Sequence, residues 1–364
     1  MNLREWGWDE EWAAAFAPHA AEGLQPARVV RQDRGAWEIQ TEEGVRSAEP
    51  TGRFRRELEA GAAEFPSVGD WVAIDSRPTC DRAGIAATLP RRTCLSRQAV
   101  GRATREQVLA ANVDVVFLVC ALDDGRGFNL PRLERSLALV RASGAEAVVA
   151  LNKADLCDDV GGRVREAQYA ASDAPVVALS ATEGWGVEDL RPWLAERRTG
   201  VLLGPSGVGK SALVNALLGE SLQATQPVRA EDARGRHTTT RRELFRIPSG
   251  GLLVDTAGLR EFQPWEADAE LDAVFPEVAE LAAHCRFRDC RHEGEPGCAV
   301  QQALGEGGLD ARRFEHYLRL KREQAYQEQK RDLGAQLAEK ARWKQIAQWQ
   351  KDMYRHRDGG GGRP

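Results

Sequence analysis

The chain has 364 residues, of which 42% are hydrophobic and 29% charged, and its formal net charge of -5 excludes a uniformly basic nucleic-acid binder. This length and composition are ordinary for a folded protein of two or three domains. No apolar run approaches the roughly 20 residues that span a bilayer, and the charged, aromatic start differs from a secretory signal. The seven cysteines are an odd number, which favours a reducing compartment. We therefore expect a cytoplasmic protein without a membrane partner.

The first predicted elements are a tail and a small β-barrel. Residues 1–23 form the tail, which contains a short amphipathic helix. Residues 24–100 carry short alternating runs between turn residues, including Ala27–Val30, Ala36–Gln40 and Asp70–Ile74. Strands of this length and spacing are typical of a small barrel, which is a common platform for RNA.

Residues 101–264 alternate between strands and helices. Val113–Leu122 is almost continuously apolar, as expected for a buried parallel strand, and Leu130–Ser143 is an amphipathic helix. Further strands are predicted at Ala147–Leu151, Val176–Leu179, Val201–Leu203 and Leu252–Val254. This rhythm predicts a doubly wound α/β domain.

A glycine-rich loop follows the strand that ends at Leu203. Its residues are Gly204-Pro205-Ser206-Gly207-Val208-Gly209-Lys210-Ser211, and a predicted helix, Ala212–Leu218, comes next. The segment fits G-x-x-x-x-G-K-[ST], in which backbone N–H groups and the helix dipole bind phosphates. We expect Gly204 to Ala212 to hold the phosphates, with Lys210 on the β- and γ-phosphates and Ser211 on Mg²⁺.

A second motif predicts which base is bound. Asn152-Lys153-Ala154-Asp155 follows the strand ending at Leu151, and Ser180-Ala181 follows the strand ending at Leu179. In an N-K-x-D motif the aspartate accepts hydrogen bonds from guanine, and adenine cannot offer the same donors. These six residues predict a guanine site.

The remaining nucleotide residues come after the phosphate loop. Asp255 and Gly258 belong to an Asp-x-x-Gly motif, placed to hold Mg²⁺ and to meet the γ-phosphate. Thr239 lies in a segment between the two motifs and is predicted to join Ser211 and Asp255 at Mg²⁺. The base motifs therefore precede the phosphate loop, which is a circular permutation of the usual GTPase order. A parallel sheet tolerates this because its site loops leave from one edge.

The catalytic residue is less evident. The position after Asp-x-x-Gly, where small GTPases carry a glutamine that orients water, is Leu259. His237 is the nearest side chain that could position water, although it could equally cap or pack its loop. Activation by a partner is expected, since completing such a site can accelerate hydrolysis by roughly 10³–10⁵-fold.

Residues 265–308 are loop-rich and contain Cys285, Cys290, His292 and Cys298. Three cysteines and a histidine make a closed set for structural zinc, with no position left for catalysis. His284 could compete as the histidine ligand, but the spacing favours His292. A stretch this short needs the metal for its stability.

Residues 309–364 form a basic helical extension with a glycine-rich end. Between Arg312 and Arg357, Lys and Arg outnumber Asp and Glu and alternate with aromatic residues such as Phe314 and Tyr317. The helix either docks on its own protein or contacts RNA phosphates. Arg91, Arg92, Arg97 and Arg102 add positive charge after the predicted barrel.

Together these features resemble the family of ribosome small subunit-dependent GTPases, also called the YjeQ family. The resemblance covers roughly residues 24–300 and includes the permuted order, the Cys/His spacing, the run from Gly235 to Thr240 and the segment from Leu89 to Arg97. It implies an OB-fold barrel, GTP hydrolysis stimulated by the small subunit, and a role in late maturation of that subunit and its rRNA. It also places His237 on the family's proposed catalytic histidine. One departure is Ala257, where the family usually has proline.

The prediction is therefore a monomeric, Mg²⁺-dependent GTPase that binds GTP and GDP, one structural Zn²⁺ and the small ribosomal subunit. Two alternatives remain. Leu259 could mark an RNA-binding switch with negligible turnover, or the GTPase could act on the large subunit.

Overall fold

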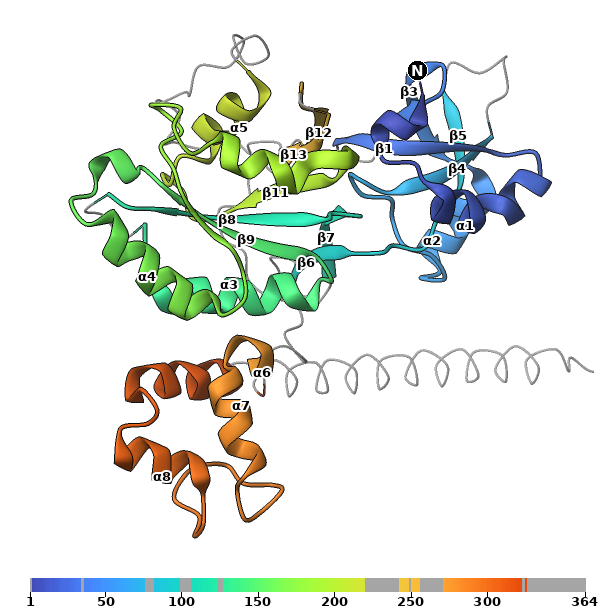
Figure 1. Ribbon diagram of the computed structural model, residues 1–364. Helices are drawn as coiled ribbons and strands as arrows, with labels where there is room; N and C mark the ends of the chain where they lie inside the picture. The colour runs from blue at the N-terminus through green and yellow to red at the C-terminus, as the bar shows by residue number, and fades with distance from the viewer. Residues whose placement is uncertain are drawn as a thin grey trace, which may run out of the picture. The chain divides into compact units, whose positions relative to one another are not determined.

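The computed structural model describes residues 2–33, 36–75, 82–98, 106–123, 127–219, 242–248, 250–255, 271–322 and 325. Contacts within the chain define two compact units, and all described residues before Cys285 belong to the first. The second unit contains the described residues from Cys285 onward. Figure 1 shows the helices and strands of both units.

The barrel consists of β1 (Gln25–Asp33), β2 (Ala36–Thr41), β3 (Gly44–Pro50), β4 (Trp71–Asp75) and β5 (Ala83–Thr88). Antiparallel pairing of β1 with β2 and β4, together with the parallel pair β3–β5, closes it in the order β1-β2-β3-β5-β4-β1. Helix α2 (Gly52–Glu59) places Phe54 in the core beside Ile39 and Ile85. The expected OB-like barrel is confirmed.

The N-terminal segment is packed onto the barrel, which differs from the expected tail. It forms a 3-10 helix, η1 (Leu3–Trp6), and helix α1 (Glu10–Ala21), which Asp9 caps by accepting from the Trp12 N–H at 2.8 Å. Trp12 and Phe16 are buried, and the Trp8 ring meets Trp71 of β4 edge-on at 4.7 Å. Burial of large aromatic side chains is strongly stabilising, and a tail extended into solvent would leave them exposed.

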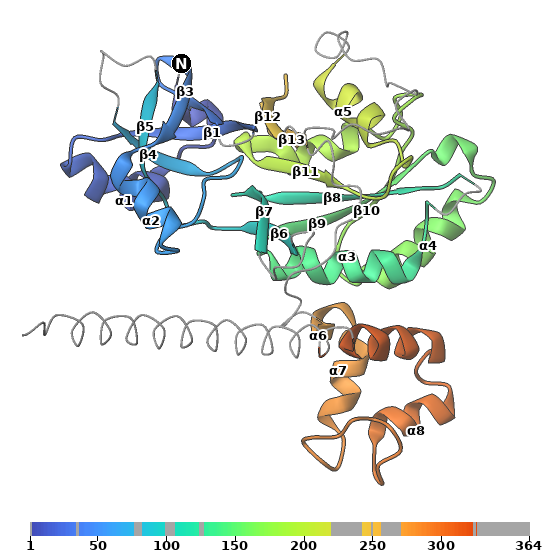
Figure 2. The same cartoon turned by 180° about the vertical axis from the view of Figure 1, so that it is seen from behind.

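The GTPase sheet follows in the same unit. Its parallel strands are β8 (Val115–Ala121), β9 (Glu146–Asn152), β10 (Val176–Ala178), β11 (Thr199–Leu203) and β13 (Leu252–Asp255), in the order β10-β9-β8-β11-β13. Helices α3 (Leu130–Ala142) and α4 (Val160–Ala171) cover one face, and α5 (Lys210–Leu218) covers the other (Figure 2). Short 3-10 helices η2 (Ala154–Leu156) and η3 (Glu188–Arg197) complete the connections. The predicted α/β domain is confirmed.

Three strands belong to neither the barrel nor the parallel sheet. β6 (Cys94–Gln98) and β7 (Glu106–Ala111) form a separate antiparallel pair. β12 (Arg242–Arg246) pairs with β13 on one side and with the end of β1 on the other, opposite Arg31 and Gln32. The barrel and the GTPase sheet are thereby one continuous 11-stranded sheet.

The helices α6 (Leu271–Val274) and α7 (Pro276–Ala283) end the described part of the first unit. The second unit contains loops that carry the cysteines, helix α8 (Ala299–Glu306) and a helical segment over residues 311–322. Val300, Phe314, Tyr317 and Leu320 are buried in it. Among the residues that the structure describes, no helix has the length and apolar character needed to cross a membrane.

Candidate guanine-nucleotide site and metal cluster

The phosphate loop joins the carboxyl end of β11 to the first turn of α5. Gly209 has φ +91°, and a Cβ on it would lie 2.3 Å from Asn152 Nδ2. A Cβ on Gly204 would lie 2.3 Å from the Val119 carbonyl oxygen. Glycine is therefore required at both positions, because any side chain would push the loop away from β8 and β9.

Lys210 begins α5 and turns back over the loop. Its Nζ donates to the carbonyl oxygens of Gly204 at 2.6 Å and Pro205 at 2.8 Å. The ammonium group is thus held against the first two residues of the loop. Ser211 is exposed at the start of the helix, and Ala212 is half-buried beside it.

The guanine motif is tied to the phosphate loop through one buried amide. Asn152 is only 2% exposed. Its Nδ2 donates to the Val208 carbonyl at 2.8 Å, and its Oδ1 accepts from the Ala181 N–H at 2.9 Å. Three segments that are far apart in the sequence therefore meet at the carboxyl edge of the sheet, as the motifs predicted.

The rest of the guanine motif surrounds this tether. Lys153 has φ +61° and its Nζ contacts Asp123 Oδ2 at 2.6 Å. Asp155 lies in η2 and is exposed, so its carboxylate is accessible to a base. Ala154 donates its N–H to the Leu179 carbonyl at 3.2 Å. Ser180 is fully buried, and its hydroxyl accepts from the Glu183 N–H at 3.2 Å.

Asp123 lies beside the guanine motif through its contact with Lys153, and the sequence patterns did not single it out. It follows β8, whose carboxyl end adjoins those of β9 and β11. An acidic residue that directly follows a buried parallel strand was the available signal, since such residues gather at the ligand-binding edge.

Several predicted site residues fall outside the described residues: His237, Thr239 and Gly258. Asp255 is the last residue of β13, and its backbone pairs with that of Glu243 in β12. β13 is the parallel neighbour of β11, so Asp255 lies at the same carboxyl edge as the phosphate loop.

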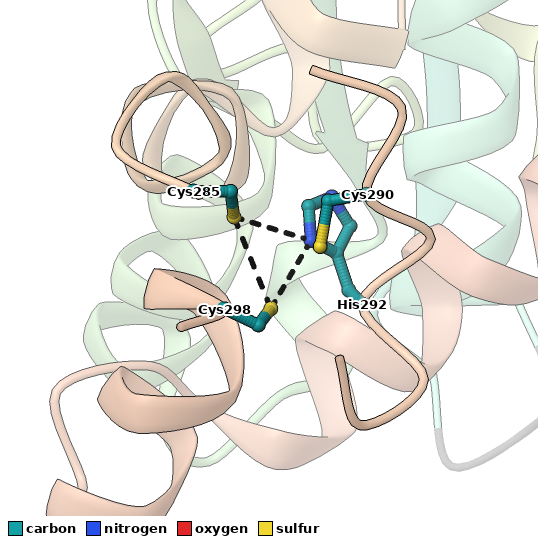
Figure 3. A group of neighbouring side chains, drawn as sticks. All are labelled: Cys285, Cys290, His292 and Cys298. Atoms are coloured by element: carbon teal, nitrogen blue, oxygen red, sulfur yellow. Dashed lines mark hydrogen bonds between the residues drawn. The ribbon is translucent and has the colours of Figure 1, made fainter. Parts of the chain in front are cut away.

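The metal cluster lies in the second unit (Figure 3). Cys285, Cys290, His292 and Cys298 place four possible ligand atoms within 4.8 Å of one another. The Cys285 and Cys298 sulfurs are 3.8 Å apart, and His292 Nδ1 lies 3.6 and 3.4 Å from them. Zinc bonds of ordinary length in a tetrahedron put two sulfurs roughly 3.8 Å apart and a sulfur and nitrogen roughly 3.6 Å apart. The donor set and its geometry fit zinc.

The two histidines have different surroundings. The ring of His284 is exposed and meets the Glu280 carbonyl at 2.8 Å, on helix α7. His292 is 4% exposed and packs edge-on against Phe314. Burial and the charge of Lys321 lower the pKa of His292, which favours the neutral imidazole that metals bind.

Two basic residues predicted to add positive charge are engaged elsewhere. Arg91 is ion-paired to the buried Asp70 at 2.7 Å. Arg92 forms a bidentate pair with Asp9. Both therefore stabilise the first unit internally. The side chain of Arg97 and all of Arg102 lie outside the described part of the chain.

Comparison with known sequences identifies relatives along nearly the whole chain. A family model described as RsgA GTPase matches residues 88–265. A small ribosomal subunit biogenesis GTPase RsgA from Opitutus terrae is 49% identical over 360 residues, which cover 96% of this chain and 97% of that protein. A protein of the same name from Streptomyces coelicolor is 44% identical over 324 residues, with coverages of 88% and 86%.

Solved structures show the same architecture. YjeQ from Thermotoga maritima superposes with a TM-score of 0.61 at 27% identity, covering 83% of this chain and 99% of that one. YloQ, described as a circularly permuted GTPase, gives a TM-score of 0.58 at 24% identity, with coverages of 83% and 95%, and supports the fold alone.

Proposed function

This chain belongs to the RsgA family of GTPases, and from that premise we propose that it acts in small ribosomal subunit maturation, with GTP hydrolysis stimulated by the subunit. The relatives' shared name and the near-complete coverage support this role. The observation that carries the proposal is the Asn152 tether, because it joins the base motif, Ser180-Ala181 and the phosphate loop into one site.

In this site different residues bind different parts of the nucleotide. Asp155 accepts from guanine, and Lys153, held by Asp123, lies along the base. The N–H groups from Gly204 to Ala212 bind the phosphates, and Lys210 exchanges its loop carbonyls for phosphate oxygens. The Gly258 N–H contacts the γ-phosphate.

Two metal ions are part of the proposal. Ser211, Thr239 and Asp255 would hold Mg²⁺, which neutralises charge on the transferred phosphate. Cys285, Cys290, His292 and Cys298 would hold one structural Zn²⁺, consistent with the distances between their ligand atoms.

The wider assignments are proposals as well. The domains are 1–23, the barrel 24–100, the GTPase domain 101–264, the zinc domain 265–308 and the basic extension 309–364. We propose rRNA as the part of the subunit that is contacted, a cytoplasmic location, and a monomeric chain.

His237 is proposed to position the attacking water. The test measures GTP hydrolysis by the wild type and by His237→Ala, alone and with purified small or large subunits. The small subunit should accelerate the wild type by roughly 10³–10⁵-fold, and the variant should lose most of this gain. Arg165→Gln changes an exposed residue of α4 and should keep it.

The experiment distinguishes failure of the proposed role from failure of the His237 assignment. A wild type that the small subunit does not stimulate contradicts the role in its maturation. A fully stimulated His237→Ala protein contradicts only the assignment of His237.

A further inference from the structure

A second hollow lies at the other end of the strand that leads to the phosphate loop. A cavity of about 240 Å³ opens where η1, the barrel and the residues before β11 meet. Its wall includes Thr199, the first residue of β11, whereas Gly204 follows the last. The cavity is thus separated from the phosphate loop by the length of a five-residue strand, roughly 16 Å.

The wall of this cavity is rich in arginine. The arginines are Arg4, Arg28, Arg92, Arg197 and Arg198. The acidic residues are fewer: Asp9, Asp114 and Glu196. Trp8 and Trp12 supply apolar wall between the charges. Arg198 is ion-paired to Glu146 at 2.5 Å, so the excess of positive charge comes from the other guanidinium groups. A concave, partly apolar surface of this kind is suited to an anion.

Two of the three acids already have partners, and one of these partners is a guanidinium group. Asp9 accepts from both terminal nitrogens of Arg92, at 2.6 and 2.7 Å. Asp114 Oδ2 accepts from the Thr199 N–H at 2.6 Å. Only Glu196, exposed at the edge, has a carboxylate for which no such partner is seen among the described residues.

Arg28 sits buried in the wall as a charge that contacts no carboxylate. It is 2% exposed, and its donors reach neutral oxygens: the carbonyls of Trp6, Gly69 and Asn112 and the hydroxyl of Thr199. Burial lowers the pKa of Arg28 to about 10, so the group still carries its charge at neutral pH. The cavity therefore has a fixed positive centre in a region of low dielectric.

The rim adds two arginines that are free to turn toward a ligand. Arg4 and Arg197 are exposed, and neither guanidinium is ion-paired among the described residues. Arg197 and its neighbour Glu196 have φ of +66° and +54°, a left-handed conformation that side-chain-bearing residues rarely adopt. Strain of this kind persists where the surroundings enforce it, often beside binding sites.

We propose that this cavity is a second anion site, distinct from the nucleotide site, that binds a phosphate group through Arg4 and Arg197 above the buried charge of Arg28. The phosphate belongs either to an RNA backbone or to a free phosphate compound. The inference goes beyond the proposed function and does not depend on it, because none of its residues belongs to the GTP motifs.

The test uses the full chain with its nucleotide site saturated with Mg²⁺ and GDP. Calorimetry then measures the binding of pyrophosphate in one arm and of a decauridylate RNA in the other. The double variant Arg4→Gln/Arg197→Gln is compared with Arg165→Gln, which removes an exposed arginine from α4. The double variant should weaken binding roughly tenfold or more, since hydrogen bonds to charged groups are lost.

Each outcome has a clear meaning. Weakening of the pyrophosphate arm identifies a free phosphate compound. Weakening of the RNA arm, with a salt dependence reduced by about two phosphate contacts, identifies a nucleic-acid backbone. Equal affinities of wild type and double variant in both arms, or no binding by the wild type, overturn the proposal.

Discussion

The nucleotide loops and the metal cluster gain their geometry in opposite ways. The loops leave the ends of β8, β9 and β11, whose residues are almost all buried, and the Asn152 tether needs no ligand to form. The four metal-binding residues come from loops and the start of α8, and Cys285 and Cys290 are only half-buried.

The fold holds the nucleotide loops in place, whereas the metal site would itself stabilise the unit that contains it. The parallel strands would pack as they do whether or not a nucleotide is present, because their apolar side chains drive burial. The loops from Cys285 to Cys298 have few apolar residues of their own, so a bound metal would supply much of their stability.

Removing the metal is the strongest test of this comparison. Cys298→Ser, or a strong chelator, should unfold the second unit, since zinc binding contributes about 10–16 kcal/mol in small zinc modules. Hydrogen exchange should become fast over residues 285–322 and stay slow in β8 and β9. GDP affinity serves as the control, and a parallel loss of GDP binding would contradict the independence of the two sites.

Removing the amide tether should disturb the nucleotide site in turn. Asn152→Ala leaves the Val208 carbonyl and the Ala181 N–H unpaired, each at a cost of about 1–3 kcal/mol. Denaturant unfolding and GDP titration should both detect the loss. The control is Asn129→Ala, which removes the cap of α3 and should cost about 1 kcal/mol without changing GDP affinity. Equal GDP affinity in the two variants would refute the tether's role.

A pair of glycines separates crowding from backbone strain. Gly209→Ala forces a Cβ to within 2.3 Å of Asn152 Nδ2 at a φ of +91°. Gly207→Ala has a similar φ of +86° but nothing within 4 Å of its Cβ. We expect about 1 kcal/mol of strain in both variants and a further loss in Gly209→Ala alone. Thermal unfolding and GDP affinity measure the difference, and identical values would show that the approach of Asn152 is unimportant.

The sequence predicted whatever is local and missed what depends on distant pairing. The phosphate loop and guanine motif are short patterns beside apolar strands, and the structure brings them together as the parallel-sheet rule requires. The pairing of β12 with β1 joins residues about 200 positions apart, and no local pattern records it. The packing of Trp8 on Trp71 is equally non-local. For the same reason the sequence predicted that Arg91 and Arg92 add free positive charge, although Asp70 and Asp9 neutralise them in the structure.

The smallest predicted effect concerns the ion pair that links the barrel to β12 of the GTPase sheet. Arg31 of the barrel contacts Glu243 of β12 at 2.6 Å and Glu38 of its own barrel at 2.9 Å. Because the Arg31 and Glu243 side chains are about a quarter exposed, a double-mutant cycle on Arg31→Gln and Glu243→Gln should give a coupling of only about 0.5–1 kcal/mol in unfolding free energy.

The matched cycle with Glu38→Gln measures a contact inside the barrel. If β12 is part of one cooperative sheet, both cycles should show coupling in the same unfolding transition, and the barrel and nucleotide loops should unfold together. Coupling for Glu38 with none for Glu243 would mean that the ion pair between the barrel and β12 adds nothing to stability. Separate unfolding transitions of the barrel and the nucleotide loops would mean that the barrel and the GTPase sheet open separately. The support of the nucleotide site would then end at β13, and the barrel could not influence that site through β12.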